Sequence, residues 1–537
     1  MKNYLSIGQS QLQEQSEVPP MDPRMRLIRT CLILVAVIAV TIMGLRLTFP
    51  LPEENFSEPT LKEDADWVGP LGATIKNALE RNPGLDGVRP LGNGRAAFAA
   101  RAILAREATS SIDAQYYIWQ DDVTGLMLLE ELRAAAERGV RVRLLVDDNG
   151  ISGLDGLLAE LDALPHANVR IFNPFTLRNP KLLSYAFDFG RLNRRMHNKS
   201  MTVDGVATIV GGRNIGDIYF DYGAGTHYLD VDAIAIGPIV DEVSQSFDAY
   251  WNSASAYDAE LFLEPSSEKT LKTKADAARQ TAVGAGYQRA IQENELADRI
   301  SARDLKFEWS EVTLFVDDPS KGLGEVESGD LIVEQLIEFA KTSETSLDLV
   351  SAYFIPGERG AEVLEGLAES GVKVRILTNS LDATDVMPVH AAYMRYREDL
   401  LNSGVELLEL RALRREHRER SLPEMLAGSA SGLHAKVFGS DGERIFIGSY
   451  NLDPRSARLN TEMGLMIESP TITQALAEQL NRPEFSYRVE LNDSGEMIWL
   501  QEEKDGTVTI HSVDPETNGL QRALTAVVRW LPVEWML

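Results

Sequence analysis

Two short segments, far apart in the chain, carry histidine, lysine and aspartate at identical spacing. Each reads His-x-Lys-x4-Asp, a pattern that about one chain in a hundred of this length and average composition contains by chance. Two copies at equal spacing therefore indicate a shared chemical role. The side chains are His197, Lys199 and Asp204 in the first segment and His434, Lys436 and Asp441 in the second.

Each segment is followed by small residues and, 17 positions after its histidine, by an asparagine. The first copy has Gly212 shortly before Asn214, and the second has Ser449 shortly before Asn451. Residues i and i+2 of a strand share a face, so each imidazole is expected beside an ammonium group. We expect the lysines and asparagines to bind the non-bridging oxygens of a phosphate, with the small residues leaving room for its approach.

A pair of imidazoles beside a bound phosphate can break and remake a phosphodiester bond. Attack by one histidine forms a covalent phosphohistidine, which divides one difficult displacement into two easier ones. The second histidine protonates the departing oxygen. One histidine from each segment is therefore needed in the same site.

Each histidine also needs a carboxylate on its other ring nitrogen, which fixes its tautomer. Aligning the two copies on a Gly-Pro and a Ser-Pro dipeptide places Asp230 opposite Glu462, and we predict these acids as the orienting pair. Asp204 and Asp441 each stand between a strand-like sequence and a glycine. A structural role in a turn is as well supported there as direct catalysis.

The two segments belong to an internal repeat of strand, helix and strand. In each copy a β-rich run with aromatic residues near its end precedes a helical pattern and two further strand patterns. Matching positions lie about 232 to 237 residues apart, so the second half is a diverged copy of the first. The matched ranges are 112–118 with 347–355, 126–138 with 361–370, 139–145 with 371–377, and 169–172 with 405–408.

This repeat predicts an α/β protein of two lobes, each a mixed β-sheet flanked by helices, preceded by an N-terminal transmembrane helix. The charged segment between the lobes has the composition of a helical linker or insertion. The predicted units are a cytoplasmic leader (1–26), a transmembrane anchor (27–49), a linker (50–90), the first lobe (91–258), the helical linker or insertion (259–330), the second lobe (331–490) and a C-terminal tail (491–537).

The predicted anchor is apolar apart from Arg29 and Arg46, and it reaches membrane length when both arginines extend towards the interfaces. A cleaved signal peptide has a similar apolar core, but no small-residue cleavage site follows this one. Arg24 and Arg26 precede the stretch. The positive-inside rule then predicts a cytoplasmic N-terminus, with the lobes in the periplasm or outside the cell.

The composition narrows the function classes. A formal charge of −28, from 53 basic and 81 acidic residues, disfavours nucleic acid as a partner. The single cysteine, Cys31, lies in the apolar stretch, so neither disulfides nor cysteine-bound zinc are expected in the lobes. A metal bound by histidines and acids is not expected either, because Lys199 and Lys436 would place cations beside it. No cofactor is predicted.

The paired His-Lys-Asp motifs resemble those of the phospholipase D superfamily. Over most of residues 90–537 the chain is similar to the bacterial cardiolipin synthase C type, on the segments 116–122, 193–200, 210–217, 451–456 and 531–535. The resemblance implies metal-free transfer of a phosphatidyl group between phospholipids at the bacterial inner membrane. Phosphatidylglycerol would be the acceptor, and phosphatidylethanolamine is a candidate substrate beside it. The resemblance also implies that His197 is the nucleophile and that His434 is first the general acid and then the base.

Hydrolysis uses the same residues with water as the acceptor, so a phospholipase D that forms phosphatidic acid is the alternative. Exclusion of water by the surrounding pocket separates the two reactions. A phosphodiesterase or nuclease is the third choice. The sequence does not predict the donor lipid, an accessory protein or the oligomeric state.

Overall fold

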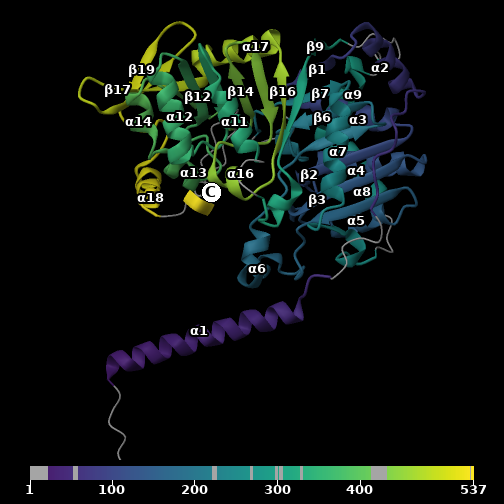
Figure 1. Cartoon of the computed structure of the whole chain (residues 1–537), viewed down its shortest axis with the longest axis horizontal. Coiled ribbons are helices and arrows are strands. Elements are labelled where there is room, and N and C mark those ends of the chain that lie inside the picture. The colour runs from purple at the N-terminus through teal and green to yellow at the C-terminus, as the bar shows by residue number, and fades with distance from the viewer. Residues whose placement is uncertain are drawn as a thin grey trace, which may run out of the picture.

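The computed structural model describes residues 22–52, 59–220, 227–265, 270–296, 300, 306–326, 331–412, 432–531 and 534–536. Residues 1–21, the greater part of the predicted leader, lie outside these ranges. So do residues 532 and 533 of the motif that ends the chain. Figure 1 shows two lobes side by side, with one long helix standing apart from both.

The first lobe is built on a nine-stranded sheet. Its strands β2, β3 and β4 run parallel, and the other pairings are antiparallel. In spatial order the strands are β8 (Ala256–Asp258), β4 (Ala167–Phe172), β3 (Arg141–Gly150), β2 (Ser111–Ile118), β5 (Ser200–Val203), β6 (Ala207–Gly211), β7 (Asp232–Ile236), β1 (Asp86–Leu91) and β9 (Glu308–Ser310).

The second lobe is built on a ten-stranded sheet whose centre repeats that order. Strands β11 and β12 occupy the places of β2 and β3, and strands β13 to β16 occupy those of β4 to β7. This correspondence confirms the predicted two-lobed α/β fold. In spatial order the strands are β10 (Val312–Val316), β16 (Met463–Glu468), β15 (Arg444–Gly448), β14 (Lys436–Ser440), β11 (Ser346–Ser351), β12 (Lys373–Asn379), β13 (Glu406–Leu410), β17 (Ser486–Leu491), β18 (Met497–Glu502) and β19 (Val508–His511).

Helices flank the sheets and connect their strands (Figure 1). In the first lobe these are α2 (Pro70–Arg81), α3 (Gly94–Glu107), α4 (Val123–Glu137), α5 (Asp155–Asp162), α6 (Tyr185–Leu192), α7 (Ile239–Trp251), α8 (Leu271–Arg279) and α9 (Ala282–Gln292). In the second they are α11 (Ile332–Lys341), α12 (Gly357–Glu369), α13 (Met387–Tyr393), α14 (Arg397–Asn402), α16 (Pro454–Arg458), α17 (Pro470–Leu480) and α18 (Gly519–Arg529). Short 3-10 turns are η1 (Lys181–Ser184), η2 (Asp217–Tyr219), η3 (Ala259–Leu261), η4 (Pro319–Gly322), η5 (Pro483–Phe485) and η6 (Glu534–Met536).

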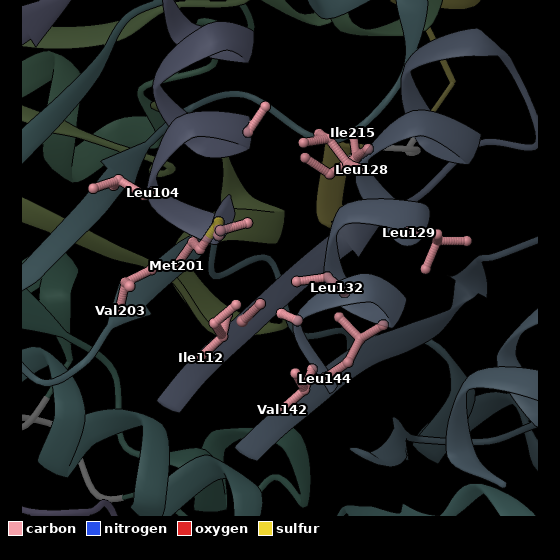
Figure 2. Close-up of a cluster of buried hydrophobic side chains, with 14 of the residues drawn as sticks. Leu104, Ile112, Leu128, Leu129, Leu132, Val142, Leu144, Met201, Val203 and Ile215 are labelled. Carbon is pink, nitrogen blue, oxygen red and sulfur yellow. The ribbon is translucent and has the colours of Figure 1, made fainter. Parts of the chain in front are cut away.

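Each sheet buries both of its faces. On the helix side of the first sheet, Ile112 and Met201 pack against Leu128 and Leu132 of α4 (Figure 2). On the other side, residues of both lobes share one core, in which Val210 of β6 belongs to the same cluster as the residues of β15 and β16. Alternate residues of a strand point to opposite faces, so the same short strands supply both cores. The two sheets therefore pack against each other, and the lobes form one unit.

Several segments outside the predicted lobe boundaries are part of the lobes. In the predicted linker 259–330, α8 and α9 pack on α4 and α3, while β9 and β10 each add an edge strand to one sheet. The predicted tail contains β18, β19 and α18, which packs on α13. These added strands have only three to six residues, so each offers little apolar–polar alternation by which to identify it in the sequence.

The predicted anchor forms helix α1 (Pro23–Thr48), none of whose residues is buried. Its 26 residues are long and apolar enough to cross a membrane. They extend about 39 Å at the α-helical rise, against about 30 Å for the hydrocarbon core of a bilayer. At its C-terminal end, Arg46 donates a hydrogen bond to the carbonyl oxygen of Phe187 in α6, and the ring of Phe49 stacks on the Phe187 ring.

Candidate active site

The two histidine segments meet where the lobes face each other. Each segment pairs through its backbone with the acid-bearing segment of the opposite lobe. The backbone N–H of His197 donates to the carbonyl oxygen of Thr461 at 2.9 Å, and the backbone N–H of His434 donates to that of Leu229 at 2.8 Å. The strands β5 and β14 begin at or just after the lysines, so the histidines lie immediately before the strands and not within them. Both histidine side chains are nearly enclosed, with 7% of each residue exposed.

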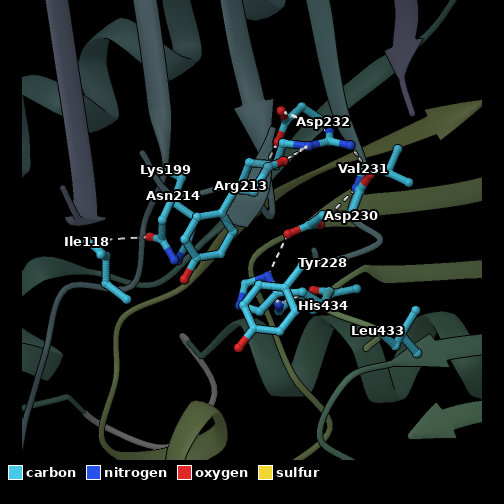
Figure 3. Close-up of polar contacts among 12 residues, drawn as sticks. Ile118, Lys199, Arg213, Asn214, Tyr228, Asp230, Val231, Asp232, Leu433 and His434 are labelled. Atoms are coloured by element: carbon cyan, nitrogen blue, oxygen red, sulfur yellow. Dashed lines mark hydrogen bonds and ion pairs between the residues drawn. The ribbon is translucent and has the colours of Figure 1, made fainter. Parts of the chain in front are cut away.

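Asp230 and Glu462 contact the two histidines, and they do so across the lobes. Nδ1 of His197 lies 2.8 Å from Oε2 of Glu462. Nδ1 of His434 lies 2.5 Å from Oδ2 of Asp230, a contact that Figure 3 shows. The backbone pairing between the lobes explains the exchange, because it aligns each histidine with the acid strand of the other repeat. With the proton of Nδ1 donated to a carboxylate, Nε2 of each ring is left to react.

The small residues Gly212 and Ser449 make room for these carboxylates. A Cβ atom on Gly212 would lie 2.1 Å from Oδ1 of Asp230, so any larger residue would displace the acid. At the equivalent place in the second lobe, the Ser449 hydroxyl donates to Oε2 of Glu462 at 2.5 Å. A phosphate was the expected occupant of the space beside these small residues. In the structure this space holds the carboxylate that orients the histidine of the opposite lobe.

Lys199 and Lys436 lie beside the histidines, with 1% of each residue exposed. Nζ of Lys199 donates to the carbonyl oxygen of His197 at 2.5 Å, and Lys436 donates to the carbonyl oxygen of His434. Nζ of Lys436 also lies 2.9 Å from Nδ1 of His434. Burial lowers the pKa of Lys199 to about 7, and it lowers the pKa of Lys436 as well. In their protonated forms the two lysines provide local positive charge in a chain that is strongly acidic overall, and a bound phosphate would favour those forms.

An asparagine completes each half-site. The side-chain oxygen of Asn214 accepts the N–H of Ile118 at 3.1 Å (Figure 3), and the Asn214 side chain also hydrogen-bonds Tyr219. Asn451 is buried too, and its amide oxygen has no hydrogen-bond donor within the described part of the chain. Buried polar atoms are normally paired, so the Asn451 oxygen is suited to accept a hydrogen bond from a ligand.

Burial lowers the pKa of both histidines, and it lowers that of His197 more strongly. Burial lowers the pKa of His197 well below its usual value, and the charges of Lys199 and Lys436 lower it further. The pKa of His434 is also lowered, by burial and by Lys436, but ionised Asp230 opposes this effect. Neutral imidazole with a free Nε2 is the form that can attack phosphorus.

The two orienting acids differ from each other. Burial raises the pKa of Glu462, even though Lys199 and the hydroxyl of Ser449 oppose the effect. Burial also acts to raise the pKa of Asp230, but the charges of His434 and Lys436 outweigh it, and the net pKa lies below the usual value. Asp230 is therefore the more readily ionised of the two acids.

Asp204 and Asp441 lie in turns at the far ends of β5 and β14. The Asp204 carboxylate accepts backbone N–H groups of Thr109, Ser110 and Ser111, and Asp441 accepts those of residues 344 to 346. Seven extended residues separate each aspartate from its histidine, about 23 Å along the chain. The geometry supports the structural role in a turn and gives these aspartates no contact with the histidine rings.

Two arginines near the motifs have different surroundings. Arg213 is buried, pairs with Asp232 and donates to several backbone carbonyls, so it is bound up within the first lobe (Figure 3). Arg455 bonds Asn193 across the lobes through both terminal nitrogens, at 2.8 and 2.9 Å, and its charge contributes to the lowered pKa of His197.

Tyrosines that surround the histidines were not predicted as site residues. The ring of Tyr117 meets that of His197 edge-on at 5.0 Å. Tyr219 and Tyr228 contact the ring of His434 at 5.2 and 5.1 Å, and Tyr228 donates to Asp385. In the sequence, Tyr228 stands two residues before Asp230 and so shares its side of an extended chain, which is a signal that would have identified it.

Within the described residues, one group of side chains has the spacing of a metal site: His390, Glu409 and Asp514. Nη2 of Arg397 lies 2.9 Å from Glu409, 3.2 Å from Asp514 and 2.5 Å from Nε2 of His390. A guanidinium group already occupies the centre of this cluster and neutralises its acids. The cluster therefore fixes α14 to β13 and to the segment before α18, and it offers no place for a second cation.

The comparisons with known proteins agree with this geometry. The family model described as "Cardiolipin synthase, PLD-like domain" matches residues 103–251 and 336–483, one match in each lobe. Cardiolipin synthase C of Escherichia coli (strain K12) is 40% identical over 471 residues, which cover 87% of this chain and 99% of that protein. An uncharacterized protein of Helicobacter pylori (strain ATCC 700392 / 26695) is 30% identical over 441 residues, or 81% of this chain and 84% of that one.

Among solved structures, phosphatidylserine synthase of Haemophilus influenzae Rd KW20 has a similar fold. The TM-score is 0.53 at 17% sequence identity, and the match covers 86% of this chain and 100% of that one. The family resemblance inferred from the paired motifs is thereby confirmed. The chain belongs to the family of cardiolipin synthases with phospholipase D-like domains.

Proposed function

We propose that this protein is a cardiolipin synthase that transfers a phosphatidyl group to phosphatidylglycerol through a phosphohistidine. The observation that carries the proposal is the crossed arrangement of two histidine–carboxylate pairs in one enclosed site. Two buried lysines lie beside the pairs and suit the oxygens of a phosphodiester, and the buried amide oxygen of Asn451 can accept a hydrogen bond from a substrate hydroxyl. The similarity to cardiolipin synthase C supports the same substrate class.

In the proposed first step, Nε2 of His197 attacks the phosphorus of the donor lipid. The reacting form has His434 protonated on both ring nitrogens and His197 neutral. The bond from phosphorus to the headgroup oxygen breaks, and Nε2 of His434 gives its proton to that oxygen. In the second step, His434 takes a proton from a hydroxyl of phosphatidylglycerol. That oxygen attacks phosphorus, the bond from phosphorus to His197 breaks, and cardiolipin leaves. Phosphatidylglycerol and phosphatidylethanolamine are the proposed candidate donors.

The electrostatics support this division of roles. A nucleophile must stay unprotonated, and the pKa of His197 lies well below its usual value. A general acid must carry a proton. Burial and Lys436 lower the pKa of His434 as well, but ionised Asp230 opposes the fall, so His434 keeps more of its proton affinity than His197 does. The histidines are otherwise nearly equivalent, so the difference between Asp230 and Glu462 is what separates them.

Transfer is favoured over hydrolysis by the enclosure of the site. The rings of Tyr117, Tyr219 and Tyr228 pack on the two imidazoles, and both histidines are almost fully buried. Exclusion of water from the phosphohistidine leaves it to a lipid hydroxyl. Phospholipase D activity, with phosphatidic acid as the product, remains the alternative.

The family match together with helix α1 indicates a membrane-anchored protein. We place it in the bacterial inner membrane, with the lobes on the periplasmic side. The support is the charge bias, since Arg24, Arg26 and Arg29 precede the apolar core and Arg46 alone follows it.

The test is a lipid assay on the full-length protein in vesicles of labelled phosphatidylglycerol and phosphatidylethanolamine. Cardiolipin formed by the intact protein, and by neither His197→Ala nor His434→Ala, is the expected result. Phosphatidic acid as the main product would replace the synthase with a phospholipase. The absence of any lipid product would overturn the proposal.

A further inference from the structure

The second lobe contains a cavity of about 800 Å³ between its sheet and the helices α11 and α12. This volume falls within the range of about 300–1,000 Å³ that is usual for small-molecule sites. The walls are mostly aliphatic and aromatic, formed by residues such as Leu336, Phe339, Leu349, Val363 and Phe438. A cavity with such walls favours an apolar occupant.

The equivalent place in the first lobe is closed. There a space of only about 10 Å³ remains between α3, α4 and β2. The strand pairings show that the two places correspond, because Ala114 of β2 pairs with Met201 of β5 as Leu349 of β11 pairs with Phe438 of β14. The repeat thus provides an internal comparison in which one copy packs solidly and the other does not.

Particular side chains account for the difference. In the first lobe, the rings of Tyr116 and Trp119 help to close the space, and Arg101 bonds the Tyr116 hydroxyl. At the position of Tyr116 the second repeat has Ser351, whose hydroxyl donates to the backbone carbonyl oxygen of Tyr353. At the position of Trp119 it has Phe354, which packs on Tyr393 of α13 and not on the cavity.

Part of the cavity wall is charged, with both signs present. Arg359 pairs with Glu334 at 2.6 Å, and Arg395 pairs with Glu534 at 3.0 Å. Arg395 also donates to the carbonyl oxygens of Arg529 and Leu531, which places the end of α18 beside the cavity. Trp530, next to these carbonyls, is 87% exposed. Ion pairs and an exposed indole beside an apolar cavity are typical of a membrane–water interface, which suits an amphiphile.

The cavity also reaches the active-site loop. Tyr450, Leu452 and Asp453, which surround Asn451, form part of its wall. Asp453 caps the N–H of Ser456, whose hydroxyl in turn holds Glu462. An occupant of the cavity would therefore lie directly behind the segment that carries one half-site.

We propose that this cavity binds an acyl chain of a phospholipid, with the ion pairs and the exposed indole beside it on the headgroup side. The inference rests on the proposed function for the choice of lipid, since a phosphatidyl donor or acceptor must place its chains somewhere near the site. It assigns them to the second lobe and not to its closed counterpart in the first.

The test uses phosphatidylglycerol with a photoreactive diazirine near the end of one acyl chain. The full-length His197→Ala variant, in detergent micelles, is irradiated in its presence and digested, and labelled peptides are identified by mass spectrometry. Label is expected on residues 331–341 and 357–369, and on α1, which meets the micelle in every sample and serves as the internal standard. Label on α1 without label on α11 or α12 would overturn the inference.

Filling the cavity provides the matched comparison. In the same background, Val363→Phe adds bulk to the wall and should reduce the label on α11 and α12, relative to α1, at least about fivefold. Val363→Ala, which enlarges the cavity, should retain it. Equal labelling of the two variants would contradict the inference, and Ala340→Leu replaces Val363→Phe if that variant does not fold. Labelling is measured on the inactive His197→Ala variant and cardiolipin synthesis on the intact protein, so the two results are independent. Synthesis by the intact protein without cavity label in the variant refutes only this inference. Cavity label without synthesis refutes only the proposed function.

Discussion

Replacing each orienting acid by its amide should separate the two histidines by the step that each performs. Asp230→Asn removes the negative charge beside His434, and Glu462→Gln removes the acid beside His197, with little change in volume. The contacts concerned are 2.5 and 2.8 Å long. A hydrogen bond to a charged group contributes about 1.5–3 kcal/mol, which corresponds to a rate loss of about 10- to 150-fold when it acts in the transition state.

The assay uses a donor whose leaving group is p-nitrophenol, which departs without a proton. With this donor the first step needs His197 but not the general acid. The wild-type protein should release a burst of p-nitrophenol equal to the enzyme concentration. Asp230→Asn should keep the burst and slow the later turnover about 10- to 150-fold, because His434 must still activate the acceptor. Glu462→Gln should slow the burst itself.

A matched control is Asp348→Asn, which removes a buried carboxylate of the second lobe that binds Arg375 at 2.7 Å. This variant should lower the active fraction and leave the burst rate per active molecule unchanged. A burst lost in Asp230→Asn and kept in Glu462→Gln would exchange the roles of the two histidines. Equal effects on the burst would refute the division of labour altogether.

Three further predictions follow from the site. Because the pKa of His197 is lowered, kcat/KM should persist below pH 6.5. Arg455→Met removes one of the cations that lower this pKa, so it should move the acid limb of the pH profile to higher pH. An unchanged acid limb would argue against His197 as the group whose protonation causes that limb. Asp441→Asn should cost about 1 kcal/mol of unfolding free energy in a denaturant titration without changing kcat per folded molecule, because its hydrogen bonds are partly exposed and screened by solvent. Burial acts to raise the pKa of Asp441, but its backbone hydrogen bonds lower it to about 2, so this stability should be present above pH 3.8 and disappear as the pH falls towards 2. Activity should survive dialysis against EDTA, since Lys199 and Lys436 supply the positive charge for the phosphate, and a loss restored by added magnesium or calcium would contradict this assignment.

The chemistry of the site could be predicted from the sequence because the repeat shows every functional residue type twice. Asp230 and Glu462 were identified by alignment of the copies, and both contact a histidine. Their exchange between lobes could not be predicted, because spacing within one repeat is the same whether an acid serves its own histidine or the other. The exchange depends on backbone pairing between distant segments, as between His197 and Thr461.

The role of the small residues was misjudged for a related reason. The position of Gly212 required a residue without a side chain, and a phosphate was the expected neighbour in a phosphate-binding motif. The side chain that needs the space is Asp230, 18 positions further along, on the strand that pairs beside it. Edge strands such as β9 and β10 were missed because three to five residues carry too little periodicity to be distinguished from a linker.

The crossed acids make the two lobes chemically interdependent. His197 takes its carboxylate from the second lobe, and His434 takes its carboxylate from the first. A single lobe would hold a histidine and a lysine but not the acid that fixes the ring, so duplication of the fold supplies more than a second copy of the same group. Once both copies are present in one chain, each acid can diverge independently. In this chain Asp230 packs on Gly212, whereas Glu462 accepts a hydrogen bond from Ser449. This difference between the two acids gives the two corresponding histidines unequal proton affinities.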